Sequence, residues 1–144
     1  MNITPRHDLS ADEIDALETY LYEFNREATG HHDGEGLAFV CEEDGELVGA
    51  AAGYSWGGIC ELRQVWVRAD YRGKGLGSAL LETAIAEAGR RGCAHVTLAT
   101  YDFQAPEFYR RHGFAEIGRV PDKPLGHTEF IMRKNLKMNA GTAE

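Results

Sequence analysis

Three glycines at alternate positions, Gly73, Gly75 and Gly77, are the residues of this chain whose spacing most directly suggests chemistry. Arg72 precedes them, Lys74 lies between them, and an apolar run with helical spacing follows. Glycines grouped in this way let a backbone come close to a phosphate, and the free N–H groups at the start of a helix attract an anion. The stretch therefore predicts a site for a group the size of a pyrophosphate.

Two common phosphate-binding motifs do not match this stretch. The pattern G-x-x-x-x-G-K-[ST] requires Ser or Thr after Gly-Lys, but here Gly75 follows Lys74. The dinucleotide pattern G-x-G-x-x-G would place its last glycine at Ser78 or Leu80. A nucleotide-binding domain of either kind is therefore disfavoured.

The sequence around the glycines predicts the elements that must position them. Helical spacing of apolar residues indicates one helix over residues 11–27, with a capping box at its start, and another over residues 76–90. A short third helix is expected over residues 104–112. Strands are expected over residues 2–4, 37–41, 47–54, 59–67, 95–100, 114–120 and 128–132.

The three strand-like runs between residues 37 and 67 are too closely joined for parallel crossovers, so they predict an antiparallel meander. Asp44-Gly45 between two apolar runs is a strong hairpin signal. The full order of elements indicates an α+β fold with one mixed, partly antiparallel central sheet flanked by helices. One domain over residues 1–136 is expected, with residues 137–144 as a disordered tail.

Composition narrows the class of partner. No apolar stretch approaches the roughly 18 residues of a membrane span, and the N-terminus lacks the pattern of a signal peptide, which predicts a cytoplasmic protein without a membrane partner. The net charge is −8, and the acidic residues are concentrated in residues 1–50. A field of that sign repels nucleic acid, so no nucleic-acid partner is expected.

The cysteines and histidines do not predict a metal site. Cys41, Cys60 and Cys93 lack metal-ligand spacing and lie in apolar or strand-like contexts, which indicates buried free thiols. His31-His32 lies in a stretch rich in Gly and Asp, with no further ligand set in view. No metal is therefore expected.

Two motifs at once point to a family. Arg72-Gly-Lys-Gly-Leu-Gly77 resembles the [RQ]-x-x-G-x-[GA] signature of the GNAT superfamily of N-acetyltransferases. Downstream, Ala105, Phe108-Tyr109 and Gly113-Phe114 resemble the A-x-x-[LF]-Y-x-x-x-G-[FY] segment of that family. The order of predicted elements also fits, so the resemblance covers nearly all of residues 1–136. It implies a GNAT fold and an acyl-CoA-dependent N-acetyltransferase.

The resemblance implies how acetyl-CoA is held as cosubstrate. Backbone amides of the loop and the helix start would bind its pyrophosphate, here at Arg72, Gly73, Lys74, Gly75, Leu76, Gly77 and Ser78. The pantetheine arm would pair with the preceding strand where it bulges, here at Val65, Trp66 and Val67. Asp102 departs from the family, because many members have an asparagine there that contacts the pantetheine arm.

The resemblance also implies catalytic roles. The reaction is direct attack of a neutral amine on the thioester, and Tyr109 matches the tyrosine that protonates the departing CoA sulfur. Glu61 lies eleven positions before Arg72, where histone-acetylating members place their catalytic base. A surface pair between Glu61 and Arg63, with ordered water as the base, is the alternative. A backbone amide of the preceding strand would bind the oxyanion.

Acidic and aromatic residues where the family shapes its acceptor site favour a small cationic amine. The candidate acceptor residues are Tyr20, Glu27, Tyr54 and Trp56. A protein lysine or N-terminus stays open as acceptor, and so does an acetyl-CoA-binding sensor or structural module without turnover. A homodimer is expected by analogy alone.

Overall fold

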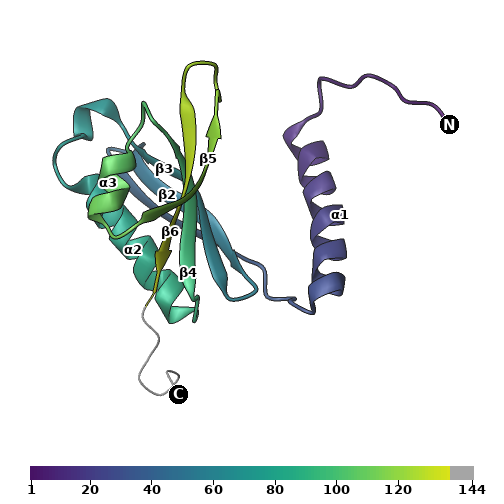
Figure 1. The fold of residues 1–144 in the computed structure, drawn as a ribbon, viewed down its shortest axis with the longest axis horizontal. Coiled ribbons are helices and arrows are strands. Elements are labelled where there is room, and N and C mark those ends of the chain that lie inside the picture. The colour runs from purple at the N-terminus through teal and green to yellow at the C-terminus, as the bar shows by residue number, and fades with distance from the viewer. Residues whose placement is uncertain (137–144) are drawn as a thin grey trace. The chain divides into compact units, whose positions relative to one another are not determined.

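The computed structural model describes residues 1–136 of the chain, so the predicted tail at residues 137–144 lies outside the described residues. The described residues belong to two compact units (Figure 1). Along the sequence, the first ends at His32 and the second begins at Asp33. Each unit is described by itself.

The first unit contains one helix, α1 (Ala11–Thr29). The predicted capping box is present, because the Ser10 hydroxyl accepts the Glu13 N–H at 3.1 Å and the Glu13 carboxylate accepts the Ser10 N–H at 3.2 Å. The predicted strand at residues 2–4 is wrong. None of the strands in the described part of the chain pairs with those three residues, and an unpaired run of that length has no ladder to stabilise it.

The second unit is built on a six-stranded sheet with the strand order β1-β2-β3-β4-β6-β5. The strands are β1 (Glu35–Glu43), β2 (Glu46–Trp56), β3 (Ile59–Val67), β4 (His95–Tyr101), β5 (Ala115–Pro121) and β6 (Thr128–Asn135). All neighbours pair antiparallel except β3 and β4, which are parallel. The predicted meander of the first three strands and the mixed, partly antiparallel sheet are therefore confirmed.

Helix α2 (Leu76–Arg90) packs on the sheet through its apolar stripe. The buried residues of this stripe are Leu80, Leu81, Ala84 and Ala88. A one-turn 3-10 helix, η1 (Ala69–Tyr71), joins β3 to the glycine loop. The short helix α3 (Pro106–Arg111) begins later than predicted, because the Gln104 side chain bends back and accepts the Tyr101 N–H at 2.9 Å. Proline then occupies the first helical position, where its missing N–H costs nothing.

The cysteines follow the prediction in two of three cases. Cys60 and Cys93 are buried, and burial raises the pKa of the Cys60 thiol to about 11. Cys41 is only partly buried, because it lines a surface depression beside the glycine loop.

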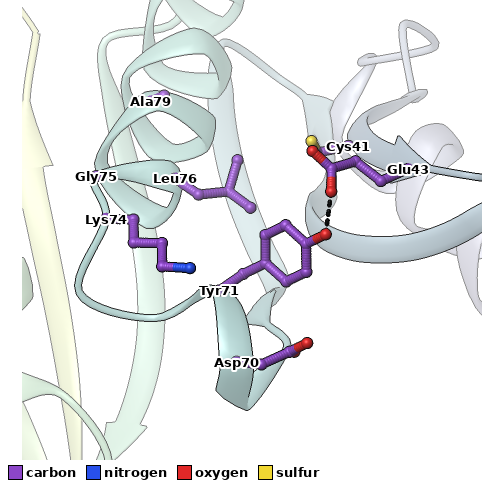
Figure 2. Close-up of a pocket in the computed structure, with 8 residues that line it drawn as sticks. All are labelled: Cys41, Glu43, Asp70, Tyr71, Lys74, Gly75, Leu76 and Ala79. Atoms are coloured by element: carbon purple, nitrogen blue, oxygen red, sulfur yellow. Dashed lines mark hydrogen bonds between the residues drawn. The ribbon is translucent and has the colours of Figure 1, made fainter.

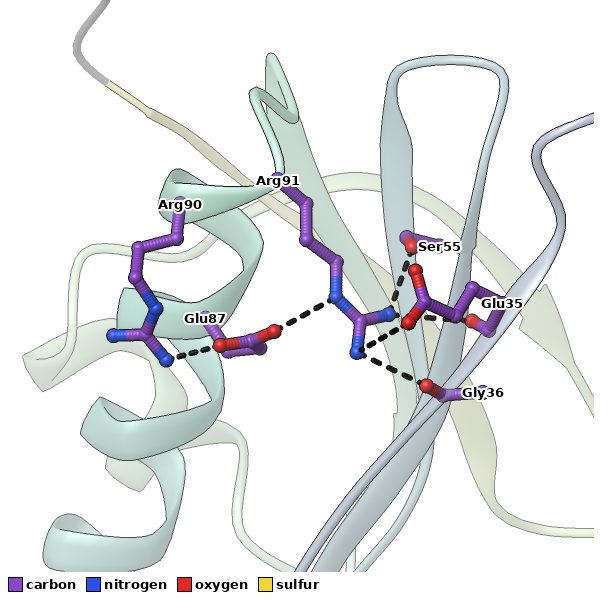
Figure 3. A network of polar contacts seen from close by, with 6 residues as sticks. All are labelled: Glu35, Gly36, Ser55, Glu87, Arg90 and Arg91. Carbon is purple, nitrogen blue, oxygen red and sulfur yellow. Dashed lines mark hydrogen bonds and ion pairs between the residues drawn. The ribbon is translucent and has the colours of Figure 1, made fainter.

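Arg91, immediately after α2, ties the end of this helix to β1 and β2 (Figure 3). Its guanidinium donates to the Glu87 carboxylate at 2.9 Å, to the Ser55 hydroxyl at 3.0 Å and to the Gly36 carbonyl oxygen at 3.1 Å. Only 18% of the side chain is exposed. One guanidinium therefore donates hydrogen bonds to acceptors on three elements, α2, β2 and β1.

Replacing Arg91 with methionine is expected to lower the free energy of unfolding by about 2 kcal/mol, because polar groups around Ser55 and Gly36 lose their donor while the apolar stem is kept. Denaturant unfolding measures the change. The matched control is Arg90→Met, which removes a 65% exposed partner of the same Glu87 and should change stability little. Equal effects of the two substitutions would contradict the role given to Arg91.

Candidate active site

The parallel strands β3 and β4 separate soon after they meet. They pair only at Cys60–Val96 and at Glu61–Thr97. Beyond Glu61, the edge of β3 that faces β4 therefore carries backbone N–H and C=O groups without a strand partner. An extended ligand with amide groups can bind such an edge as an added strand. This opening lies where the resemblance implies the pantetheine arm.

The bulge in β3 is closer to this point of separation than predicted. The register between β2 and β3 shifts so that Ala52 faces Gln64 and Gly53 faces Leu62, which leaves Arg63 as the extra residue. Residues 65–67, where the bulge was expected, pair regularly with β2. The predicted position of the bulge, at residues 65–67, is therefore wrong. The bulge lies opposite Ala52 and Gly53 of β2, so its position depends on the neighbouring strand. A Cβ on Gly53 would collide with the carbonyl oxygen of Glu61 and lie 2.8 Å from the Leu62 Cα atom.

The bulge reverses which residues of β3 face the core. Before it, Cys60 and Leu62 are buried; after it, Val65 and Val67 pack against the same core. Glu61 therefore points to the opposite face of the sheet from Cys60 and Leu62.

Replacing Gly53 with alanine is expected to lower the free energy of unfolding by about 2 kcal/mol, because the new Cβ meets backbone atoms of β3 that cannot move aside cheaply. Thermal or denaturant unfolding measures the loss. Gly36→Ala, in β1, is the control, since no atom lies within 4 Å of a Cβ built there. If Gly53→Ala were as stable as Gly36→Ala, the close approach at the bulge would be refuted.

The glycine loop and the start of α2 provide donors for an anion. Gly73 and Gly75 have φ angles of +73° and +85°, a region that glycine adopts readily. Gly75 is the N-cap of α2 and no side chain caps this end, while the Ala79 N–H already bonds the Gly75 carbonyl oxygen. The N–H groups of the first turn are thus left for a ligand. The residues fit the pyrophosphate of acetyl-CoA.

The two cationic side chains of the loop take separate positions. The Arg72 Nε donates to the Val67 carbonyl oxygen at 2.9 Å, so this side chain braces the loop against the end of β3. The Lys74 Nζ lies 5.6 Å from the centroid of the Tyr71 ring. The two cationic side chains therefore have different partners, the end of β3 for Arg72 and the Tyr71 ring for Lys74.

Figure 2 shows the depression beside Lys74, with a volume of about 820 Å³. Its floor includes Tyr71, whose hydroxyl donates to the Glu43 carboxylate. The lining residues come from β1, η1, the loop and the start of α2. Since β1 and β4 lie on opposite sides of β3 in the sheet, this depression is separate from the opening between β3 and β4. The backbone groups of β3 that lack a strand partner lie at that opening and not in this depression.

Ser78, in the first turn of α2, has a partner that the sequence did not reveal. The Ser78 hydroxyl and the His112 Nε2 share a hydrogen bond of 3.0 Å, and the His112 Nδ1 lies 3.6 Å from a Glu82 carboxylate oxygen. Only 15% of the His112 side chain is exposed. The contact fixes the hydroxyl next to the free N–H groups and joins α3 to the loop. The residues lie 34 positions apart, and no local pattern links them.

Tyr109, on α3, is 8% exposed and packs between two aromatic rings. The ring centroids of Phe108 and Phe114 lie 5.2 and 5.8 Å from that of Tyr109. Burial raises the pKa of the Tyr109 phenol above its usual value of 10.0. The hydroxyl therefore keeps its proton at neutral pH, as a general acid must.

Glu61 lies at the last paired position of β3 and β4, next to two other polar side chains, those of Arg63 and Tyr54. The Arg63 Nε donates to the Glu61 carboxylate at 3.3 Å, and the Arg63 guanidinium lies 5.0 Å from the centroid of the Tyr54 ring. Burial and, to a smaller extent, the Glu61 carboxylate raise the pKa of Tyr54. The pair with Arg63, which was the alternative to a catalytic role for Glu61, is therefore present, and the catalytic role stays a prediction.

Asp102, where many family members have an asparagine, has two hydrogen-bond partners at the start of β6. One carboxylate oxygen lies 2.9 Å from the His127 Nδ1, and the other accepts the Thr128 N–H at 2.9 Å. The hydrogen bond from His127, followed by that from the Thr128 backbone, holds the pKa of Asp102 below its usual range. Asp102 therefore anchors the start of β6.

The remaining predicted acceptor residues stay predictions. Tyr20 and Glu27 belong to α1 in the first unit, and Trp56 is the last residue of β2. Over residues 1–136, no group of three or more His, Cys, Asp or Glu side chains is arranged to hold a metal ion. None of the helices in this part of the chain is long and apolar enough to cross a membrane.

Comparison with known proteins agrees with this geometry. A model of the acetyltransferase (GNAT) family matches residues 4–114. Blasticidin-S acetyltransferase of Streptomyces morookaense is 39% identical over 99 residues, which cover 68% of this chain and 73% of that protein. A crystal structure of an acetyltransferase from Bacillus cereus ATCC 14579 has 27% identity and a TM-score of 0.76, over 92% of this chain and 98% of that one. A structure from Bacillus anthracis str. Ames, solved in complex with acetyl coenzyme A, has 16% identity and a TM-score of 0.63, over 71% and 63% of the two chains.

The fold and the glycine loop thus define an acyl-CoA-dependent acetyltransferase, as predicted. The chain belongs to the acetyltransferase (GNAT) family.

Proposed function

We propose that this chain moves the acetyl group of acetyl-CoA directly to a primary amine of a small cationic molecule. The observation that carries the proposal is the continuity of the site: the opening between β3 and β4 leads to the end of β3, and the uncapped start of α2 follows after one short turn. An extended amide chain with a pyrophosphate at its end matches that sequence of donors and acceptors.

Acetyl-CoA supplies an activated thioester when it is bound. The chain would hold its pyrophosphate with the N–H groups of the loop and the first turn of α2, and with the Ser78 hydroxyl that His112 orients. Backbone groups of residues 65–67 would hold the pantetheine arm, and an N–H of the same strand would face the developing oxyanion.

Two side chains would move protons. Tyr109 would donate its phenol proton to the departing sulfur, which its raised pKa supports. Glu61, directly or through an ordered water, would accept the proton of the attacking ammonium. Its position at the last pair of β3 and β4 supports that role.

The small-molecule acceptor is supported by the relative named for acetylating blasticidin S. Tyr54 and Trp56, at the end of β2, are the candidate acceptor contacts in the second unit. Tyr20 and Glu27, on α1 of the first unit, stay separate predictions. A cytoplasmic location and a homodimer stay predictions.

The test is release of free thiol from acetyl-CoA with a panel of primary amines, together with mass spectrometry of the products. Release that depends on one class of amine, with an N-acetylated product, supports the proposal. Tight CoA binding by calorimetry without thiol release for any amine would favour a sensor. Acetylation confined to peptide lysines or N-termini would favour a protein acceptor.

A further inference from the structure

Glu61, Arg63 and Tyr54 lie together at the point where β3 and β4 separate. We call them the Glu61–Arg63–Tyr54 cluster, and its formal charges sum to zero. Tyr54 is the cross-strand partner of Glu61, so the two side chains share one face of the sheet. Arg63 is the extra residue of the bulge, and it contacts both the Glu61 carboxylate and the Tyr54 ring. One negative charge and one positive charge therefore lie side by side at the inner end of the opening.

This arrangement disfavours an acceptor whose only charged group near the reacting centre is an ammonium. An ammonium that approaches Glu61 also approaches the Arg63 guanidinium, which is bonded to the same carboxylate. The favourable and unfavourable Coulomb energies then largely cancel. An acceptor with a carboxylate a few bonds from its amine avoids the conflict, because each of its charges meets an opposite one.

The pair between Glu61 and Arg63 is easy to exchange for a ligand. Its N–O distance is 3.3 Å, and 54% of the Arg63 side chain and 37% of the Glu61 side chain are exposed. An exposed pair of that kind stabilises a protein little, so opening it costs little. The existing bond uses the Arg63 Nε, whereas a carboxylate bound in bidentate fashion can use the edge formed by the two terminal amino groups. The Tyr54 ring meanwhile supports the guanidinium.

We infer that the acceptor is a dipolar amine, with a carboxylate that Arg63 binds while Glu61 receives the ammonium. The inference rests on the proposed acetyl transfer and narrows its acceptor class to molecules of the amino-acid type. Such a molecule can still be cationic overall if it carries a second amine, as lysine does. Arg63 is then a specificity-determining residue, whereas the sequence patterns indicated it only as a surface partner of Glu61.

The experiment compares amines that differ only in the carboxylate. Calorimetry on the protein saturated with CoA measures the affinities of L-lysine and of 1,5-diaminopentane, which is lysine without its carboxylate. The wild-type protein is expected to bind lysine about tenfold more tightly, as one charge-assisted bidentate contact can provide. Arg63→Met is expected to remove this preference by weakening lysine binding about tenfold, with no loss of diaminopentane binding.

Arg119→Met is the matched control. Arg119 is 57% exposed, also pairs with a glutamate, Glu116, and lies 5.1 Å from the centroid of an aromatic ring, that of Phe130, but it belongs to β5. It should leave both affinities unchanged. Equal binding of the two amines, binding of neither, or an equal loss of both in Arg63→Met would overturn the inference. Thiol release with diaminopentane as readily as with lysine would also overturn it while leaving acetyl transfer intact, whereas no release with any amine of the panel would count against the proposed function itself.

Discussion

Replacing Tyr109 with phenylalanine is expected to lower kcat about a hundredfold and to leave the affinity for acetyl-CoA nearly unchanged. The substitution removes the phenol proton, and loss of a positioned general acid typically costs that much. The ring and its contacts with Phe108 and Phe114 remain, so the helix and its packing should survive. Thiol release under saturating amine gives kcat, and calorimetry with CoA gives the affinity.

Tyr71→Phe serves as the control, because it removes another phenol near the loop, the one that donates to Glu43. It should keep the wild-type kcat. The pH profile adds an independent check: since burial raises the pKa of Tyr109 above 10.0, the wild-type rate should not fall through titration of this group below about pH 10. An unchanged kcat in Tyr109→Phe would remove Tyr109 from the mechanism.

Replacing Gly75 with valine is expected to weaken acetyl-CoA binding more than a hundredfold. A β-branched residue at a φ angle of +85° is strained, so the loop would change its path and lose the alignment of its N–H groups. The new side chain would also stand at the N-cap of α2, directly where the anion should lie. Calorimetry with CoA measures the loss, and circular dichroism reports whether the fold persists.

The control variant is Gly58→Val, in the turn between β2 and β3. It introduces similar backbone strain away from the proposed anion site. Gly58 has a φ angle of +81°, and no atom lies within 4 Å of a Cβ built on it, as is also true of Gly75. The two variants should therefore lose similar stability, while only Gly75→Val should lose CoA binding. Undiminished binding in Gly75→Val would refute the assignment of the loop.

Much of the fold could be predicted because its signals are local. The bounds of β3 and α2 agree with the predictions, since glycine-containing turns flank both elements and the apolar period changes between them. The loop between them was predicted as an anion site from its own residues. The start of α3 was missed because the Gln104 side chain accepts the Tyr101 N–H at the end of β4 and so holds a turn before the helix, which composition does not reveal.

The site was less accessible from the sequence, because its geometry depends on contacts between distant segments. The bulge at Arg63 requires Gly53 on the neighbouring strand, so a reading of β3 alone placed it too late. The partnership of Asp102 with His127 spans 25 positions, so no local pattern shows that this carboxylate has a structural role. A glycine inside an apolar strand, Gly53 in β2, was an available signal for the bulge.

The short pairing of β3 with β4 divides the sheet into two three-stranded parts with few hydrogen bonds between them. One part contains β1, β2 and β3, and the other contains β4, β6 and β5. Two residue pairs, Cys60–Val96 and Glu61–Thr97, join them. A ligand that lies in the opening would form hydrogen bonds with the free edge of β3. Bound there, it would add to the few interactions between the two parts of the sheet. The cosubstrate then contributes to the cohesion of the fold, by about 2.7 kcal/mol at a free concentration of 100 times its Kd. The same backbone groups of β3 would then serve both substrate binding and stability. Each release of product would lower the free energy of unfolding until the next acetyl-CoA binds.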